Sequence, residues 1–365
     1  MSTSPFLTPG HSRNRRALAA RRRRRRRLAL GALGLAVLVG LLVEMAFASG
    51  PGQHAHPRAG ASARTHGASR SAPAAVPPRS PSGLPLARPA LALSGISSPQ
   101  QNPVHVSFSR PPRAGLLFNL TTGQVLWQHN AYARLPIASL TKMMTALVTV
   151  ESAPPDARVL VTRQAVDMAG SKVGVLPLGR RVPLESMLYG LLLPSGNDAA
   201  VALAQHVSGS VNRFVVRMNQ EAAKLGLGCT RFSSPSGFYD AHNFSCAADL
   251  AVLAHADMRQ PRIASVVKTF SAAIPFPIKG GKLYLYNNNP LLIYKFPGVT
   301  GMKTGYTEAA GRCLVATAER HGVRLGVVVL NSQEPGIQAR QLLDRGFHDV
   351  YHQPVVPELP FPPGA

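Results

Sequence analysis

Cysteine is scarce in this sequence: only Cys229, Cys246 and Cys313 occur among 365 residues. No two of them have the Cys-x-x-Cys spacing, and no histidine pairing of the zinc-site type accompanies them. An exported domain could join Cys229 to Cys246, but a small and odd number of cysteines argues against a fold held by a disulfide framework. We therefore expect all three to be small buried apolar side chains, and we expect neither a metal nor another cofactor.

Acidic residues are almost absent from the first 113 positions, where 17 arginines and one acid, Glu44, give a net charge of +16. The rest of the chain has 23 bases and 15 acids, so it supplies only +8 of the total of +24. A uniformly basic chain would suggest a nucleic-acid partner. Because most of the excess lies in a segment with the features of a targeting signal, we expect no nucleic-acid partner.

No charge interrupts the run from Leu28 to Val43, which follows seven consecutive arginines at positions 21–27. A basic cluster before an apolar segment stays on the cytoplasmic side, so the chain beyond it is exported. We expect residues 1–27 to be a basic cytoplasmic segment and residues 28–48 to be a signal anchor or a signal peptide. Ala46-Phe47-Ala48 has the form of a cleavage site, whereas the apolar run approaches the ~20 residues that span a bilayer. We favour a retained anchor that holds the protein at the cytoplasmic membrane.

Large apolar residues are also few from position 49 to position 109, a stretch rich in Pro, Ala, Ser and Gly. Such a composition cannot bury enough surface to fold, which predicts a disordered linker over residues 49–109. Residues 351–365 are predicted to form a loose Pro-rich tail. A single extracytoplasmic catalytic domain is expected between them, over residues 110–350.

The pattern of this domain predicts an α/β (α+β) fold. Two apolar runs, Ala114 to Leu120 and Gln124 to Gln128, flank a turn at Thr121-Thr122-Gly123 and indicate a hairpin. Two more strand-like runs occur near the end, at positions 314–318 and 324–330. Helices are expected between and after them, at positions 139–150, 183–193, 197–207, 212–225, 247–258 and 338–347. Strands at both ends predict an antiparallel sheet completed by both termini, flanked by helices and with an inserted all-helical region.

Ser139-Leu140-Thr141-Lys142 opens the first predicted helix. Residues i and i+3 share one helical face, so the Ser139 hydroxyl and the Lys142 amine can meet. The positive field of a helix start and burial both disfavour a charged ammonium, so Lys142 can serve as the base for Ser139. The spacing alone is weak evidence, because Ser265 and Lys268 have it too.

Two further motifs carry polar side chains toward a cleft. Ser195-Gly196-Asn197 follows Pro194 at a turn between helices, where a hydroxyl can relay a proton and an amide can hold a substrate carbonyl. Ser210-Val211-Asn212 has the same pattern inside an amphipathic helix start. Lys303-Thr304-Gly305 occurs once and suits a strand that binds the anionic end of a substrate.

The order Ser-x-x-Lys, Ser-x-Asn, Lys-Thr-Gly resembles the motif set of penicillin-binding proteins and serine β-lactamases. The longer strings at positions 137–145, 195–199, 232–237 and 301–307 resemble the low-molecular-mass D-alanyl-D-alanine carboxypeptidases, serine peptidase family S11. The resemblance covers roughly residues 106–350 and implies a β-lactamase/transpeptidase-like fold. The chain departs from the best-known members by its long basic N-terminus and by lacking a separate C-terminal β-rich domain.

The resemblance implies an acyl-enzyme mechanism on peptidoglycan stem peptides, with β-lactams as covalent inhibitors of the same serine. Catalysis would fall to Ser139, with Lys142 as general base and Ser195 passing the proton to the departing D-alanine. The backbone N–H groups of Ser139 and Tyr306 would form the oxyanion hole. Of the remaining substrate-binding residues, Asn197 would hold the peptide. Lys303, Thr304 and Gly305 would lie at the terminal carboxylate of the substrate.

Four other classes of protein compete with this interpretation. A class A β-lactamase would need a Glu-x-x-x-Asn element between the first two motifs, and the two glutamates there, Glu151 and Glu185, lack the asparagine. An α/β-hydrolase would need a Gly-x-Ser-x-Gly elbow, which is absent. A non-enzymatic wall-binding protein would have lost Ser139 or Lys142. A DD-endopeptidase acting on crosslinks shares the same motifs and stays open.

Overall fold

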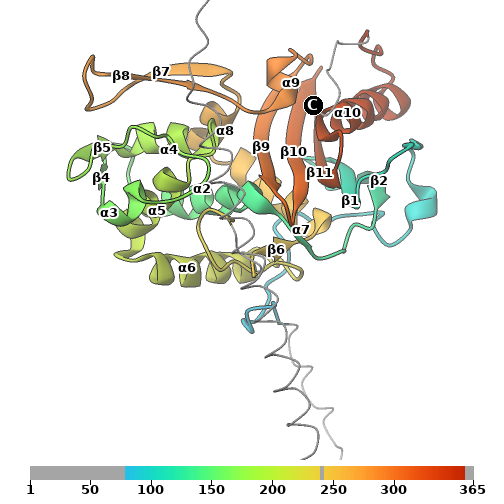
Figure 1. The fold of residues 1–365 in the computed structure, drawn as a ribbon. Helices are drawn as coiled ribbons and strands as arrows, with labels where there is room; N and C mark the ends of the chain where they lie inside the picture. The colour runs from blue at the N-terminus through green and yellow to red at the C-terminus, as the bar shows by residue number, and fades with distance from the viewer. Residues whose placement is uncertain (1–78, 239–241, 358–365) are drawn as a thin grey trace, which may run out of the picture. The chain divides into compact units, whose positions relative to one another are not determined.

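The computed structural model describes residues 79–238 and 242–357. Its centre is a five-stranded antiparallel sheet in the order β2-β1-β11-β10-β9 (Figure 1). The strands are β1 (Ala114–Asn119), β2 (Val125–His129), β9 (Val299–Thr307), β10 (Gly311–Arg320) and β11 (Val323–Ser332). Two come from the start of the domain and three from its end, so the predicted sheet that both ends of the chain complete is confirmed.

Both faces of the sheet are covered. Helix α10 (Pro335–Tyr351) packs on one face through Leu342, Leu343 and Phe347. Helices α7 (Ala247–Met258) and α8 (Pro261–Val267) pack on the other face. Burying a large apolar side chain contributes ~1.5–3 kcal/mol to the stability of the fold. Successive side chains along a strand point to opposite faces of the sheet, so each strand supplies such side chains to the cores on both faces. The sheet is therefore a fixed platform for the residues on its edge strand, β9.

The region between β2 and β9 is largely helical, as the sequence predicts. A short 3-10 turn, η2 (Ala138–Leu140), leads into α2 (Thr141–Ser152), which is buried along most of its length. The helices α4 (Leu184–Leu192), α5 (Asn197–Ser208) and α6 (Val211–Lys224) pack on it, and α3 (Arg163–Val166) packs on α5. The predicted helices are present with ends shifted by a few residues, and Pro194 separates α4 from α5.

Several short elements lack a clear sequence pattern. They are η1 (Pro99–Gln101), α9 (Pro290–Ile293) and the strand pairs β3 (Leu135–Pro136) with β6 (Phe244–Ser245), β4 (Arg158–Leu160) with β5 (Arg181–Pro183), and β7 (Ser271–Pro275) with β8 (Lys282–Tyr286). Elements of two to five residues are too short for periodicity to reveal. The β7–β8 hairpin lies beside α4 and α8 (Figure 1).

The folded domain begins before the boundary expected at residue 110. From Arg79 the chain lies on the domain, where Leu91, Ile96 and Val104 are buried and Ser94 bridges to Gln124. These few apolar residues are buried against the domain. The prediction of a linker rested on the average composition of the segment, which does not reveal a few buried residues. Residues 1–78, with the expected basic segment, signal segment and first half of the linker, lie outside the described residues. Within the described residues no helix is both long and apolar enough to cross a bilayer.

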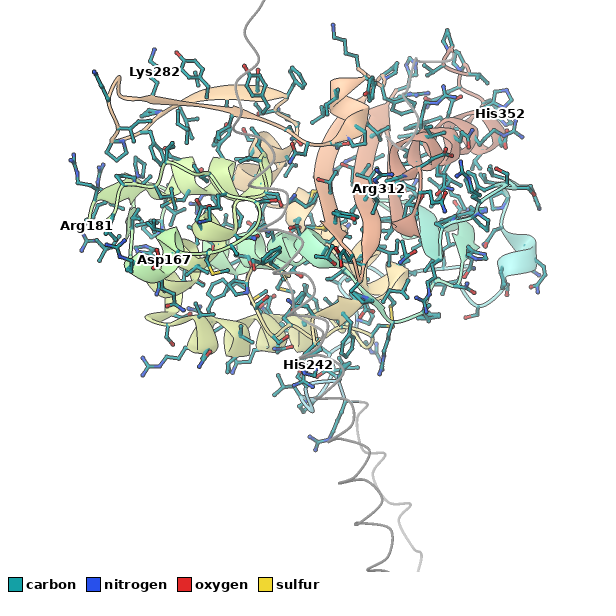
Figure 2. The ribbon with its side chains drawn as sticks, in the orientation of Figure 1. Asp167, Arg181, His242, Lys282, Arg312 and His352 are labelled. Atoms are coloured by element: carbon teal, nitrogen blue, oxygen red, sulfur yellow. A yellow bond between two sulfur atoms is a disulfide. The ribbon has the colours of Figure 1, made fainter. Side chains whose placement is uncertain are left out.

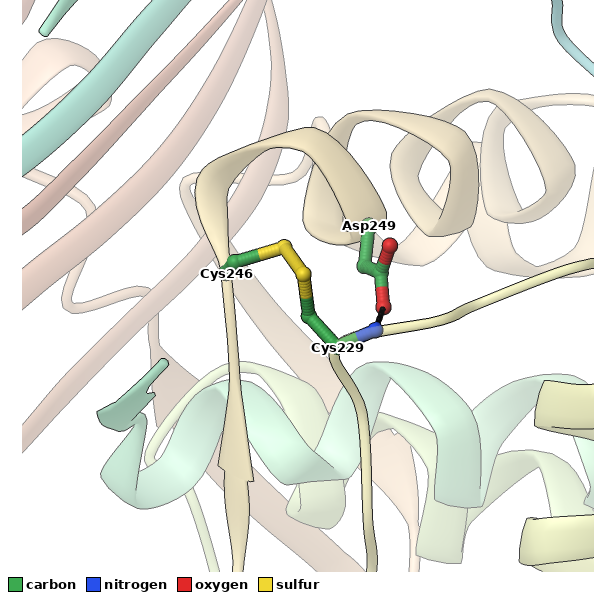
Figure 3. A group of neighbouring side chains, drawn as sticks. All are labelled: Cys229, Cys246 and Asp249. Atoms are coloured by element: carbon green, nitrogen blue, oxygen red, sulfur yellow. Dashed lines mark hydrogen bonds between the residues drawn. A yellow bond between two sulfur atoms is a disulfide. The ribbon is translucent and has the colours of Figure 1, made fainter. Parts of the chain in front are cut away.

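The expectation for two of the cysteines was wrong. A disulfide joins Cys229 to Cys246, with their Cα atoms 5.7 Å apart (Figure 3). The two residues are brought together because β6 ends at Ser245, and Cys246 then starts α7 beside the segment that follows α6. Cys313 is a buried free thiol, as expected. The described part of the tail, to residue 357, has no regular structure after α10.

Candidate active site

Ser139 and Lys142 meet at the start of α2, as their spacing predicts. Ser139 lies in η2, and the Lys142 Nζ is 2.8 Å from its Oγ. The Lys142 side chain is fully buried, and its Nζ also donates hydrogen bonds to Asn197 Oδ1 at 2.7 Å and to the Ser236 carbonyl oxygen at 3.0 Å. A neutral amine has two hydrogens. If these two acceptors take them, the nitrogen lone pair is left facing the Ser139 hydroxyl.

The surroundings of Lys142 favour its neutral form. Burial lowers the pKa of Lys142 well below its usual value, and the positive charge of nearby Lys303 acts in the same direction. Asp198 opposes them, but its carboxylate is already held by three backbone N–H groups, those of Val173 at 2.9 Å, Gly174 at 3.0 Å and Ala199 at 2.8 Å. The first two effects dominate, so the pair has the electrostatics of a base beside a nucleophile.

Ser195 lies at the turn between α4 and α5 in a left-handed backbone conformation, with φ of +67°. This conformation is unfavourable for a residue with a Cβ atom. Its Oγ is buried, and the described residues offer it no hydrogen-bond partner. A strained backbone that holds a buried hydroxyl without a partner is typical of a functional position rather than of a stabilising one.

The Asn197 side chain is held within the protein. Its side chain is 1% exposed, with Oδ1 accepting from Lys142 and Nδ2 donating to the Ala169 carbonyl at 2.8 Å. Both ends of the amide are therefore used within the protein. A Ser-x-Asn pattern shows that an amide follows the turn, but it does not show which way the amide points.

Strand β9 brings the third motif to the site. A Cβ atom on Gly305 would lie 2.9 Å from the Ile137 carbonyl oxygen and 3.1 Å from the Ser139 nitrogen. Glycine is therefore needed for β9 to approach η2 this closely. Lys303 is 1% exposed, and burial lowers its pKa to about 7. Its Nζ donates to the Thr304 carbonyl oxygen at 3.0 Å, so this lysine lies beneath the surface rather than in solvent.

A cavity of about 480 Å³ joins these elements. Ser139 and Ser195 line it from the helical side, and Thr304, Gly305 and Tyr306 line it from β9. Further lining residues that the sequence did not single out are Ser171, Asn288, Pro290, Ile293, Tyr294, Arg312, Cys313, Leu314 and Pro335. Arg312 lies on β10, opposite Tyr306 in the sheet (Figure 2). Of the eight residues predicted for the site, five line the cavity, and Lys142, Asn197 and Lys303 lie behind its wall.

The two alternative motif matches are not part of the site. Ser265 and Lys268 are both exposed at the end of α8. Ser210 caps α6, where its Oγ accepts a hydrogen bond from the Arg213 N–H. Their positions agree with the sequence, in which Ser265 comes after Ser195 and so breaks the motif order, and Ser210 lies at an amphipathic helix start.

The Ser236 carbonyl is the acceptor that sequence reasoning missed. It lies in the loop between Cys229 and Cys246, and the same loop gives the Pro235 carbonyl oxygen to Thr145 Oγ1 at 2.7 Å. Figure 3 shows Asp249 beside the disulfide, where its carboxylate accepts from the Cys229 N–H at 2.7 Å. A backbone carbonyl leaves no mark in a sequence; the only available signal was the family-like string at positions 232–237.

Comparison with known proteins gives concordant results. A family model described as D-alanyl-D-alanine carboxypeptidase matches residues 109–334. The D-alanyl-D-alanine carboxypeptidase DacF of Bacillus subtilis is 34% identical over 251 residues, which cover 67% of this chain and 64% of that protein. A D-alanyl-D-alanine endopeptidase of Pseudomonas aeruginosa is 35% identical over 243 residues, covering 62% of this chain and 77% of that protein. The chain thus spans slightly less than two thirds of the length of DacF.

Solved structures show the same fold. The crystal structure of the Streptomyces K15 DD-transpeptidase matches with a TM-score of 0.63 and 31% identity, over 67% of this chain and 99% of that one. The D-alanyl-D-alanine carboxypeptidase DacD from Francisella tularensis matches with a TM-score of 0.61 and 25% identity, over 67% of this chain and 72% of that one. The predicted transpeptidase-like architecture is therefore confirmed.

Proposed function

This chain is a member of the D-alanyl-D-alanine carboxypeptidase family, and on that premise we propose that it removes the terminal D-alanine from peptidoglycan stem peptides through an acyl-enzyme. One observation carries the proposal. A fully buried lysine has its Nζ 2.8 Å from the hydroxyl of a serine that lines a cavity, while two other acceptors take its hydrogens. The pair can therefore activate a nucleophile without a metal or a cofactor.

The proposed reaction has two steps. The Ser139 Oγ attacks the carbonyl carbon between the two terminal D-alanines, and its proton passes to the Lys142 Nζ. The proton then reaches the amine of the departing D-alanine, with the Ser195 hydroxyl as relay, and the peptide bond breaks. Water attacks the resulting ester by the reverse proton path and releases the shortened peptide and free Ser139.

Charge that develops on the carbonyl oxygen needs donors, and we assign these to the backbone N–H groups of Ser139 and Tyr306. The close approach of Gly305 to the Ser139 nitrogen supports this assignment, because Tyr306 is the next residue on β9. We assign Thr304 and the positive charge of Lys303 to the terminal carboxylate of the substrate. The geometry favours Asn197 as a residue that positions Lys142, in place of the expected contact with the peptide.

A DD-endopeptidase activity on crosslinked stem peptides is the second candidate. The match to the Pseudomonas protein named as an endopeptidase favours it. Mass spectrometry of peptidoglycan fragments after incubation separates the two, because a carboxypeptidase releases D-alanine from monomeric stems whereas an endopeptidase converts dimers to monomers. A β-lactamase is disfavoured because the Glu-x-x-x-Asn element is absent from the sequence.

Location is the remaining part of the proposal. We propose that the domain lies on the extracytoplasmic side and that the segment at positions 28–48 anchors it to the membrane. The support is the order of seven arginines and an uncharged apolar run in the sequence. N-terminal sequencing of the mature protein tests the anchor, since a start at Ser49 would show cleavage after Ala48. Protease shaving of intact cells tests the export.

Covalent labelling tests the catalytic assignment. A fluorescent penicillin is expected to label the purified domain, and Ser139→Ala is expected to abolish the labelling. Ser265→Ala is the matched control, because it removes the serine of the exposed pair that has the same spacing. Equal labelling of the wild type and Ser139→Ala would end the proposed mechanism.

A further inference from the structure

Exposed aromatic side chains gather on one segment of the described chain. Of the eleven large apolar side chains that are exposed there, five lie between positions 270 and 306: Phe270, Tyr284, Tyr286, Ile293 and Tyr306. Tyr284 is 67% exposed and Tyr286 is 63% exposed, although both belong to a regular strand. Scattered exposed apolar residues need no explanation, but a cluster on one element indicates a contact surface.

The β7–β8 hairpin has one buried and one open face. Leu283 and Leu285 of β8 and Ile274 of β7 are buried against the domain, and Ser186 of α4 donates to the Pro275 carbonyl at 2.8 Å. The intervening side chains therefore point to solvent from a hairpin that is fixed on its other side. A surface held in this way loses little conformational entropy when a ligand binds.

The partners of the two tyrosines across the hairpin are small. Tyr286 lies opposite Ser271, and Tyr284 lies opposite Ala273. Neighbours of this size leave much of each ring uncovered. Phe270 meets Tyr286 edge to face, with ring centroids 6.4 Å apart, which extends the same surface toward α8. We call Phe270, Tyr284 and Tyr286 the aromatic face of the hairpin.

The chain segment that carries the aromatic face has charges of one sign. The sequence has seven basic and no acidic residues from Met258 to Thr307. Four of the lysines, Lys268, Lys279, Lys282 and Lys295, are exposed, and Lys282 lies toward the turn end of β8 (Figure 2). Glu185 of the adjacent helix α4 is paired with Arg262, so the exposed lysines of this segment are left to attract an anionic ligand.

The chain leads from the aromatic face to the wall of the candidate active site. Two residues after Tyr286, Asn288 lines the cavity, and its N–H donates to the Leu193 carbonyl at 3.3 Å, just before the Ser195 turn. Ile293 and Tyr306, two more of the exposed apolar residues, line the same cavity. A polymer whose side branch enters the cavity would therefore lie close to this face.

We propose that the aromatic face of the β7–β8 hairpin binds the sugar chain of peptidoglycan, next to the stem peptide whose end enters the cavity. The C–H groups of a sugar ring face pack on the electron-rich face of an aromatic ring, and the lysines pair with carboxylates of the stem peptides. This inference rests on the proposed function. It adds that the enzyme recognises polymeric substrate through a surface outside the catalytic cavity.

The experiment compares polymeric and short substrates with the variant Tyr284→Ala/Tyr286→Ala. On a short soluble acyl-D-alanyl-D-alanine peptide, kcat/KM is expected to stay within about twofold of wild type, because a peptide that fills only the cavity does not reach the hairpin. On purified peptidoglycan strands, kcat/KM is expected to fall about tenfold, through KM. Tyr132→Ala is the matched control, since Tyr132 is 58% exposed on another part of the domain. Equal losses on both substrates, or none on either, overturn the proposal.

A binding measurement separates this inference from the catalytic one. Ser139→Ala protein, which is not expected to turn over substrate, is sedimented with insoluble peptidoglycan, with and without the two tyrosine substitutions. We expect about tenfold weaker binding in the substituted protein and no change with Tyr132→Ala, whatever the outcome of the catalytic assays. Unchanged binding refutes the inference. Loss of binding to anionic phospholipid vesicles, with peptidoglycan binding intact, would show that the face meets a membrane instead.

Discussion

Removing the disulfide is expected to slow acylation as well as to destabilise the domain. Cys229 and Cys246 are 17 positions apart, and the loop between them carries the Ser236 carbonyl that accepts a hydrogen bond from the Lys142 Nζ. The same loop ends at β6, which pairs with β3, the strand immediately before η2 and Ser139. The disulfide therefore closes a loop that contacts Lys142 directly and pairs with the strand that leads to Ser139.

The size of the effect follows from these contacts. A crosslink that closes a loop of this length is worth about 3 kcal/mol in the chain-entropy model. Other contacts still hold the loop after reduction: Asn243 bonds to the Ser233 N–H at 2.8 Å and to Ser234 Oγ at 2.7 Å, and Asp249 bonds to the Cys229 N–H. The loop should loosen without unfolding. We expect acylation to slow about tenfold, which corresponds to about 1.4 kcal/mol in the barrier.

The assay is the acylation rate of Cys229→Ser/Cys246→Ser with a fluorescent penicillin, measured below its melting temperature. The melting temperature itself should fall by roughly 6–12 °C, given about 2–4 °C per kcal/mol for a domain of this size. A reductant provides the internal control: it should slow the wild type to the rate of the double variant and leave the variant unchanged. Burial raises the pKa of the Cys313 thiol to about 12, so that residue stays inert. If the double variant were acylated at the same rate as the wild type, the reasoning would be refuted.

Three other predictions concern the catalytic groups. Lys142→Arg should retain binding of the β-lactam but lose acylation in stopped-flow labelling, because a guanidinium cannot give up its proton in this pH range; a retained rate would place the base elsewhere. The pH profile of kcat/KM should be bell-shaped. It should rise as Lys142 loses its proton and fall above about pH 7, where Lys303 loses the charge that attracts a carboxylate, and Lys303→Arg should remove the alkaline limb. Ser195→Gly and Ser195→Ala should lose activity to the same extent. In thermal unfolding, however, the glycine variant should be more stable than the alanine variant by about 1 kcal/mol, because φ is +67° at this position and only glycine adopts that conformation without strain. Equal stabilities would show that the turn relaxes.

The sequence predicts the fold well where the signal is local. The helices α5, α6 and α7 are long runs of helix-forming residues, with clear apolar periodicity in α6, and their ends agree with the prediction within about one residue. The boundary at residue 110 was placed too late, because a few apolar residues such as Leu91 and Val104 lie among many prolines and serines. The disulfide stayed an open alternative for a similar reason. Cysteine count and spacing say nothing about two residues that β6 and α7 bring together.

The limits of local pattern are clearest in the two Ser-x-x-Lys pairs. Ser139 with Lys142 and Ser265 with Lys268 have the same spacing, and each pair can share one face of a helix. The first lysine is fully buried, and its Nζ is held by groups 55 and 94 positions away in the chain, whereas the second is exposed at the end of α8. Burial lowers the pKa of Lys142 and so favours its neutral form, which can act as a base. The chemistry of the motif therefore comes from the segments that cover it, which is why the order of three distant motifs identified the pair when its spacing could not.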